Sequence, residues 1–236
     1  MVASRAKAIA KRILTRHLTS RLEFETSVAV TPVSEVFGLD RGTPLDRVFI
    51  RRFLEAHKDL IRGDCLEVEE PTYTRKFGQP GHVAHTLKFS ASSDGADQCE
   101  VVADLSKPET VPQGRFDAFI CTQTLNFIFD LNPVIDSIHK LLKTGGHALI
   151  TVAGISQISR FDYDRWGDYW RFTDLTLRKL LTRRFAEADC RIATFGNVAT
   201  SCLFLQGVAL EDIPDRKMDA TDPNYQMVVC AVVRKQ

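Results

Sequence analysis

Short apolar runs alternate with amphipathic segments along most of the chain, from residue 43 to the C-terminus. The apolar runs have the length of buried strands, and the segments between them repeat apolar residues at helical spacing. The expected strands are 65–68, 82–90, 99–105, 116–125, 147–154, 190–197 and 226–235, and the expected helices are 43–60, 132–146, 173–185 and 199–213. Apolar strands that alternate with helices indicate an α/β domain with a mostly parallel sheet and helices on both faces.

Capping residues mark the ends of several of these helices. Thr43 is expected to cap the first one, with Pro44 at the first helical position and Asp46 completing a capping-box-like start. Thr173 is expected to cap the third helix, and the glycine pair 145–146 to stop the second.

The N-terminal residues differ from the rest of the chain. Residues 3–19 are basic and amphipathic, and no acidic residue occurs before Glu23. A helix of this kind can lie on an anionic membrane surface, or it can pack its apolar stripe on the domain or a partner, which is the commoner outcome. We therefore expect two parts, an N-terminal helix with its connector in 1–32 and an α/β domain in 33–236.

Charge and cysteine content exclude some classes of protein. The net charge is +1, with 31 basic and 30 acidic side chains, whereas a protein that coats nucleic acid needs a concentrated basic surface. The six cysteines form no C-x-x-C pair and mostly lie in apolar runs, which is typical of buried thiols and not of a metal site. We find no secretory signal and no apolar run that could span a membrane, so we expect a cytoplasmic protein, peripheral at the membrane if residues 3–19 bind there.

Several motifs follow one another in a characteristic order. They are CLEV at 65–68, VVADL at 101–105, FDAFICTQTL at 116–125 and HKLLKTGGHALIT at 139–151. This order resembles class I S-adenosylmethionine-dependent methyltransferases and implies their Rossmann-like, seven-stranded fold. More narrowly, YTRKFG at 73–78 and the tryptophan-containing stretch 154–173 resemble a bacterial group of methyltransferase-domain proteins. Members of this group occur alone or fused to glycosyltransferases in surface-polysaccharide systems.

The resemblance implies cofactor roles for four residues at strand ends. Glu67 matches the acid that ends the first strand and supports the cofactor-binding loop, and Asp104 matches the acidic position beside the adenine. Gln123 and Thr124 follow the fourth strand, beside the place of the methyl donor. From the residues alone, the simpler interpretations are that Asp104 caps its own loop and that Gln123 is an ordinary strand-end residue.

Two positions depart from the family pattern. Glu69, followed by Glu70, stands where a glycine normally lets the backbone approach the methionine part of the cofactor. Its charge would face the cofactor's carboxylate unless a cation intervenes, at a cost on the order of several kcal/mol. The second strand normally ends on an acid that binds the ribose hydroxyls, and Leu87 stands there instead. S-adenosylmethionine therefore binds in an altered pose, or the site has been lost.

The segment 160–171 is rich in groups that recognise sugars. Its aromatic rings offer flat faces for a sugar ring, and its charged groups can bind hydroxyls; these are Trp166, Tyr169, Trp170, Arg160, Asp162, Asp164, Asp168 and Arg171. An equally good interpretation is an aromatic lid that packs on the core. Tyr73 and Arg75 are expected to line the entrance, with Arg75 offsetting Glu69 or Glu70.

These observations favour a methyltransferase that acts on a sugar hydroxyl of a polysaccharide or glycolipid precursor. Such a reaction needs a base to remove the hydroxyl proton, and the candidates are His85, Asp162 and Asp168. The alternative is a catalytically silent module that binds a glycan or a glycosyltransferase partner. No metal ligand set and no nucleic-acid partner are expected.

Overall fold

The computed structural model describes residues 30–90, 99–213 and 218–236. The expected helix in residues 3–19 lies outside these ranges. The chain divides between Pro32 and Val33, and residues 33–236 form one compact unit. No helix in the described ranges is long and apolar enough to cross a membrane.

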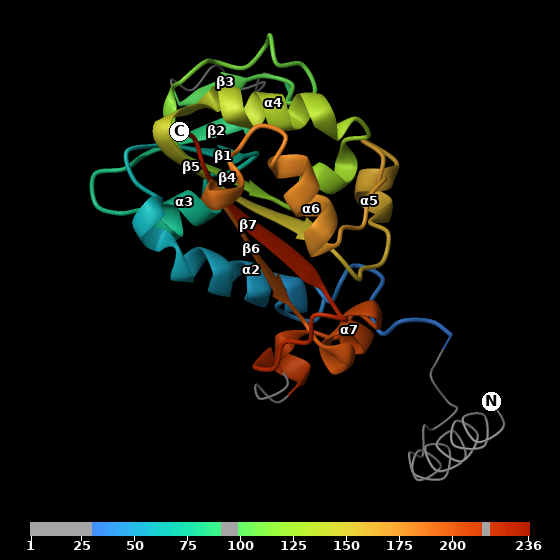
Figure 1. The fold of residues 1–236 in the computed structure, drawn as a ribbon. Coiled ribbons are helices and arrows are strands. Elements are labelled where there is room, and N and C mark those ends of the chain that lie inside the picture. The colour runs from blue at the N-terminus through green and yellow to red at the C-terminus, as the bar shows by residue number, and fades with distance from the viewer. Residues whose placement is uncertain (1–29, 91–98, 214–217) are drawn as a thin grey trace, which may run out of the picture. The chain divides into compact units, whose positions relative to one another are not determined.

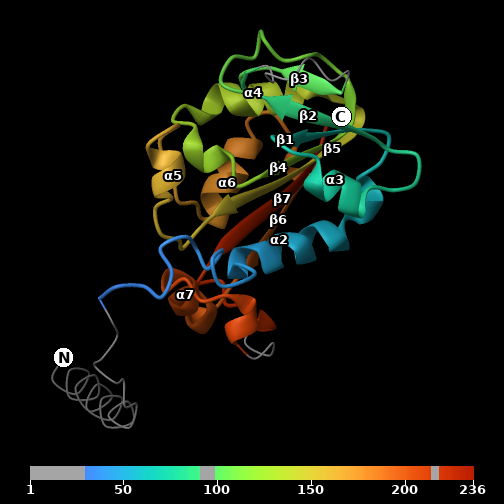
Figure 2. The same ribbon diagram turned by 180° about the vertical axis from the view of Figure 1, so that it is seen from behind.

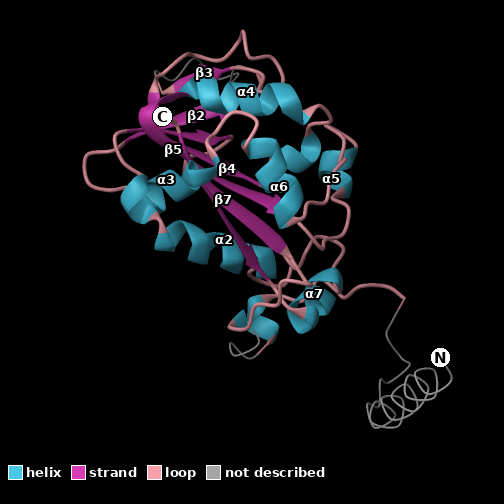
Figure 3. Ribbon diagram, in the orientation of Figure 1, coloured by secondary structure: helices cyan, strands magenta, loops and turns pink. Residues whose placement is uncertain are grey.

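A seven-stranded sheet forms the centre of the domain, in the order β3-β2-β1-β4-β5-β7-β6 (Figures 1 and 3). The strands are β1 Asp64–Val68, β2 Val83–Lys88, β3 Glu100–Val102, β4 Phe116–Thr122, β5 Leu142–Ala153, β6 Cys190–Phe195 and β7 Val228–Arg234. Strands β1 to β5 pair in parallel, and only β7 runs antiparallel to its neighbours β5 and β6. The predicted fold class is confirmed.

Helices cover both faces of the sheet, as the two opposite views show (Figures 1 and 2). Helices α2 Leu45–Ala56, α3 Thr72–Phe77 and α7 Val198–Leu205 pack on one face, and α4 Leu131–Leu141 and α6 Asp174–Leu181 on the other. Neighbouring residues of β1 separate the two cores, because strand side chains alternate between faces. Cys65 belongs to the core beneath α2, and Leu66 to the core beneath α4.

The cysteines behave mainly as small hydrophobic residues. Cys65, Cys121, Cys190 and Cys230 are buried free thiols, and Cys202 is an exposed one. Burial raises the pKa of the Cys121 thiol to about 12, which makes it unreactive at neutral pH.

The order of the strands reverses beside β1. From β1 the chain continues to β2 on one side and later crosses to β4 on the other. Ligands in open α/β sheets bind over the carboxyl ends of the strands at such a point. The short helix α5 Arg160–Tyr163 follows β5 at this edge.

The expected cap at Thr43 is wrong. Helix α2 begins at Leu45 after Pro44 and has no side-chain cap. The N–H and hydroxyl of Thr43 instead donate to the carboxylate of Glu211, at 2.7 and 2.8 Å. Because a distant segment takes this hydroxyl, local spacing cannot reveal its partner. The cap at Thr173 is confirmed, since its hydroxyl accepts the N–H of Thr176 at 3.2 Å.

The expected helix stop at the glycine pair 145–146 is also wrong. Helix α4 ends at Leu141, and the chain enters β5 at Leu142. The pairing of β4 with β5 skips from Phe116↔Leu142 to Ala118↔His147, so the glycines lie in an irregular stretch of the strand. A side chain at Gly146 would meet the carbonyl oxygen of Lys143 at 2.9 Å. The glycines therefore permit a strand bulge rather than a helix end.

Candidate functional site

A cavity of about 1430 Å³ lies over the carboxyl ends of β1, β2, β4 and β5. Its wall includes the loops that follow these strands, the start of α2, and the segment around α5. The cavity therefore occupies the place where the reversal of strand order predicts a ligand site.

Glu67 organises the loop after β1. Its side chain is buried, and its two carboxylate oxygens accept the N–H groups of Tyr73 at 3.0 Å and Thr74 at 2.7 Å. Burial raises the pKa of Glu67, and the two N–H groups counteract that rise. Glu67 holds the first turn of α3 against the end of β1, in agreement with the loop-supporting role that the family resemblance implies.

Glu69 adopts a backbone conformation that normally belongs to glycine. Its φ is +65°, and its N–H donates to the carbonyl of Leu87 at 2.9 Å. Its carboxylate pairs with the ammonium of Lys88, the last residue of β2, at 3.1 Å. The cation that pairs with Glu69 is therefore Lys88. The expectation that Arg75 offsets Glu69 or Glu70 is wrong for ion pairing, since Arg75 has no ion pair with either residue in the described structure.

Leu87 itself cannot bind a ribose. Its side chain is buried in the core beneath α4, as expected for an apolar residue at that position. The next residue, Lys88, lines the cavity. The end of β2 thus presents a cation, Lys88, directly after the position where the family pattern has an acid.

Asp104 lines the cavity and also caps its own loop. Its carboxylate accepts the N–H of Ser106 at 2.9 Å and the Ser106 hydroxyl at 2.6 Å, and it pairs with Lys107 at 3.2 Å. Burial raises the pKa of Asp104, but the bonds from Ser106 and Lys107 outweigh it and the pKa is lowered. Its position fits the family role, while its bonds are those of a loop-capping acid.

Gln123 and Asn126 form a polar wall after β4. Gln123 has φ +50°, and its N–H donates to the carbonyl of Thr151 at 2.8 Å. Asn126 donates to Gln123 Oε1 at 3.4 Å, and Gln123 Nε2 is buried without a partner in the described structure. The neighbouring Thr124 hydroxyl donates to the carbonyl of Thr122 at 3.1 Å. An unpaired buried donor in a cavity wall suits a ligand with an acceptor atom.

Backbone strain is concentrated around this cavity. Among the described residues, three non-glycine residues have positive φ, namely Phe37, Glu69 and Gln123, and all three line the cavity. Such strain costs about 1–3 kcal/mol per residue and persists where function requires it. This clustering is independent support for a functional site.

Asn126, which the sequence does not single out, connects the cavity to the tryptophan-containing stretch 154–173, the aromatic segment. It is buried, and its carbonyl accepts the N–H groups of Tyr169 at 2.9 Å and Trp170 at 3.3 Å. Its side-chain oxygen accepts the N–H of Ala153 at the end of β5. One residue thus connects β4, β5 and the aromatic segment, which only the tertiary structure reveals.

An ion pair between Asp168 and Arg171 stabilises the aromatic segment. The Asp168 side chain is 1% exposed, and two parallel bonds of 2.6 and 2.9 Å join it to the Arg171 guanidinium. Arg171 also donates to the carbonyls of Ser156, Gln157 and Trp170. Burial raises the pKa of Asp168, but Arg171 and the N–H of Ser159 outweigh it and the pKa is lowered. The hydrogen-bonding groups of both side chains are thus used within the protein.

The aromatic residues of this segment differ in packing and in exposure to solvent. Trp170 stacks on Phe129 with centroids 5.9 Å apart and donates its indole N–H to the carbonyl of Ile128 at 3.1 Å. Trp166 is 52% exposed, meets Phe89 edge-on at 5.9 Å and lines the cavity, as Tyr169 also does. Trp170 therefore supports the segment, whereas Trp166 and Tyr169 offer accessible surface.

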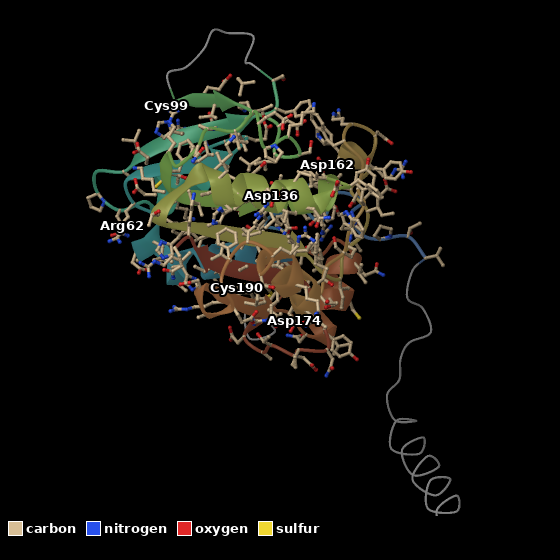
Figure 4. All side chains as sticks on the ribbon, turned by 45° about the horizontal axis from the view of Figure 1, so that its top comes forward. Arg62, Cys99, Asp136, Asp162, Asp174 and Cys190 are labelled. Atoms are coloured by element: carbon tan, nitrogen blue, oxygen red, sulfur yellow. The ribbon has the colours of Figure 1, made fainter. Side chains whose placement is uncertain are left out.

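The remaining acceptor candidates also differ in position. Asp162, labelled in Figure 4, lies on α5, lines the cavity and accepts the hydroxyl of Ser159 at 2.6 Å. Arg160 pairs with Asp164 at 3.3 Å in solvent and lies outside the cavity wall.

The three candidate bases are not brought together. His85 is buried in the middle of β2, 3.4 Å from Asp64 at the amino end of β1, and does not line the cavity. Asp168 is occupied by Arg171, which leaves Asp162 among the candidates. Sequence reasoning missed Asp46, a cavity-lining carboxylate at the start of α2 that accepts the N–H of Arg47 at 2.8 Å.

Asp46 and Tyr73 form the other titratable part of the wall. Burial raises the pKa of Asp46, because its carboxylate is only 15% exposed and Arg47 compensates incompletely at 3.8 Å. Burial also raises the pKa of Tyr73, which lines the cavity as expected, while Arg75 does not. Within the described ranges, no group of three or more His, Cys, Asp or Glu side chains is arranged to hold a metal ion.

Comparisons with solved structures agree with this geometry. A methyltransferase from Archaeoglobus fulgidus matches with a TM-score of 0.51 and 11% identity, over 80% of this chain and 94% of that one. A methyltransferase from Mesorhizobium loti gives 0.50 and 16%, over 84% and 100% of the two chains. The N-methyltransferase NodS from Bradyrhizobium japonicum, solved with S-adenosyl-L-homocysteine, gives 0.50 and 15%, over 82% and 88%. At these identities the likeness shows the fold.

The sequence comparison assigns the family. No curated protein matches the chain. Residues 66–194, more than half of the 236 residues, match the family model of a methyltransferase domain. The chain therefore belongs to the methyltransferase-domain family, with the sheet of the class I S-adenosylmethionine-dependent methyltransferases.

Proposed function

We propose that the protein binds S-adenosylmethionine in the cavity and methylates a sugar hydroxyl of a polysaccharide or glycolipid precursor. The observation that carries the proposal is the loop held by Glu67, which opens on the same cavity as the buried, unpaired amide of Gln123. The structure of NodS with S-adenosyl-L-homocysteine supports the choice of cofactor by fold-level analogy.

The residues present fit this cofactor in three respects. The Glu67 carboxylate orders the loop after β1, Gln123 offers a buried donor with no partner among the described residues, and Asp104 lines the same cavity. The ammonium of Lys88 lies next to Glu69 and compensates its charge. The repulsion expected between Glu69 and the cofactor's carboxylate is thereby reduced. When bound, S-adenosylmethionine supplies an electrophilic methyl group.

The acceptor would lie between α5 and the start of α2. Trp166 and Tyr169 provide apolar faces that suit a sugar ring, and Asp162 provides a hydrogen-bond acceptor for its hydroxyls. Trp170 and Arg171 contribute by holding the segment in place. This division of roles favours a glycan acceptor over a lid that packs only on the core.

Proton removal is assigned to Asp46, with Asp162 as the second candidate. A general base works best with a pKa near the operating pH. Burial moves the pKa of Asp46 in that direction, whereas the ion pair with Arg171 moves that of Asp168 away from it. Asp46 also lines the cavity near Tyr73.

The test is transfer of tritium from S-[methyl-³H]adenosylmethionine to purified hexose and 6-deoxyhexose oligosaccharides. The proposal predicts label in the glycan, with methylated sugar released by acid hydrolysis. If the full chain binds the cofactor but labels no saccharide, free or lipid-linked, the sugar acceptor is wrong. If it binds glycan without binding cofactor, the result favours the alternative of a catalytically silent module that binds a glycan.

A further inference from the structure

We infer that Glu69 supplies the ribose-binding carboxylate that the end of β2 lacks. This inference rests on the proposed cofactor and identifies the residue that binds the cofactor's ribose. It explains both departures from the family pattern, a glutamate in place of glycine and a leucine in place of an acid, as one exchange.

The two strand ends lie directly beside each other. Strands β1 and β2 pair in parallel with Val68 opposite Leu87, so Glu69 and Lys88 are the next residues at the same edge. The N–H of Glu69 continues the ladder by donating to the carbonyl of Leu87 at 2.9 Å. Any side chain at position 69 thus starts close to the tip of β2.

The conformation of Glu69 brings its carboxylate to that tip. With φ at +65°, the side chain extends across to β2, and Oε2 lies 3.1 Å from Nζ of Lys88. An acid at the end of β2 accepts the ribose hydroxyls in Rossmann-like sheets, about 20 residues after the glycine-rich turn. Here the acid reaches the same place from the neighbouring strand.

The carboxylate keeps capacity for a ligand. Lys88 holds Oε2, while Oε1 has no hydrogen-bond partner in the described structure and the side chain is 61% exposed. Both residues line the cavity, together with Leu87 and Phe89. An ionised carboxylate with a free oxygen accepts hydroxyl donors, and the vicinal diol of a ribose offers two.

Strain supports a functional reason for keeping this residue. A glycine at position 69 would adopt the same conformation without the penalty that the glutamate carries. Lys88 contributes by fixing the direction of the carboxylate and by compensating its charge. It is a positioning residue for Glu69.

The experiment is calorimetric titration of the full chain with S-adenosylhomocysteine and with its 2′,3′-dideoxyribose analogue. For the wild type, loss of both hydroxyls should weaken binding about 10- to 100-fold, as expected for hydrogen bonds to a charged group. Glu69→Gly and Glu69→Gln should weaken binding of S-adenosylhomocysteine by a similar factor and bind the two ligands almost equally. Lys88→Met should show the same trend to a smaller extent.

Glu55→Gln is the matched control. It removes an exposed Glu–Lys pair, Glu55 with Lys58 at 2.5 Å, on a residue outside the cavity wall, and should leave both affinities unchanged. Unchanged or tighter binding by Glu69→Gly, with the dideoxy analogue still discriminated, overturns this inference while the cofactor assignment stands. No binding of S-adenosylhomocysteine by the wild type or by Glu69→Gly overturns both.

Discussion

Asp168 and Arg171 form a two-bond ion pair, 2.6 and 2.9 Å, that fixes the segment between β5 and α6. The carboxylate is almost fully buried, and the guanidinium uses its remaining donors on the carbonyls of Ser156, Gln157 and Trp170. Arg171→Met leaves a buried charge unpaired and should lower the free energy of unfolding by about 3 kcal/mol. Urea unfolding measures the change. Arg160→Met removes only exposed contacts, the pair with Asp164 and the cation–π contact with the Tyr163 ring, and should cost less than about 1 kcal/mol.

The same ion pair predicts a dependence of stability on pH. The pKa of Asp168 is lowered in the folded state. The ionised carboxylate therefore contributes its full share to the free energy of unfolding above the unfolded pKa of about 3.9, and this stabilisation is lost as pH falls through the lower folded pKa. The stability difference between wild type and Arg171→Met should therefore be constant near neutrality and shrink below about pH 4. A difference that does not change on acidification would show that the pair has no such role.

Asp46 should behave in the opposite way. Its folded pKa is raised by burial, so the cost of ionising it appears as pH rises above the unfolded value of about 3.9 and is complete above the folded pKa. Asp46→Asn should thus stabilise the fold at pH 7.5, by about 1 kcal/mol, and have little effect near pH 4. Urea titrations at the two pH values test this, with the exposed Asp59→Asn as a control that changes neither.

The same Asp46→Asn variant should lose activity while it gains stability. Removal of a general base lowers turnover about 10²- to 10⁴-fold, and the rise of turnover with pH that reports the base should disappear. Binding of S-adenosylhomocysteine should be retained. If Asp162→Asn abolishes that pH dependence and Asp46→Asn does not, the base is Asp162.

Glu67 tests the organisation of the cofactor loop. Glu67→Ala leaves the N–H groups of Tyr73 and Thr74 without their acceptors and should cost about 2–4 kcal/mol of unfolding free energy. The loop would also lose its position, so affinity for S-adenosylhomocysteine should fall more than tenfold. Glu109→Ala, on an exposed residue outside the cavity wall, should change neither quantity.

The fluorescence of the two tryptophans allows a simple test of saccharide binding at the aromatic segment. The chain contains only Trp166 and Trp170, so each single variant retains one fluorophore. Trp170→Phe loses the indole bond to Ile128 and should destabilise the fold by about 1 kcal/mol. The fluorescence of its remaining Trp166 should respond to an acceptor saccharide, whereas Trp166→Phe should be equally stable but unresponsive. A response that survives undiminished in Trp166→Phe would contradict a contact between Trp166 and the saccharide.

The fold could be predicted from the sequence because its strands are marked by apolar runs that only a doubly covered sheet can bury. Cys65 and Leu66 illustrate this, since both are apolar and each enters a different core. The errors arose where distant residues decide local structure. Glu211 accepts the N–H and hydroxyl hydrogen bonds of Thr43. Leu142 pairs with Phe116, so the strand begins before the glycine pair 145–146.

The candidate site was predicted in part for the same reason. Glu67 and Gln123 could be found because they end strands, and carboxyl ends of parallel strands meet at one edge. Asp46 comes from a helix and Asn126 from a short turn, so only packing reveals that they face the cavity or its wall. Proximity in the chain suggests Arg75 as the cation that offsets Glu69 or Glu70, whereas strand pairing brings Lys88 to Glu69.

Calorimetric titration of the purified full chain decides whether this cavity binds S-adenosylmethionine. We expect one site per chain with a dissociation constant in the micromolar range for S-adenosylmethionine or S-adenosylhomocysteine. We also expect Glu67→Ala to remove the heat of binding. Absence of binding by the wild type at millimolar ligand would mean that the protein has a methyltransferase fold without its cofactor.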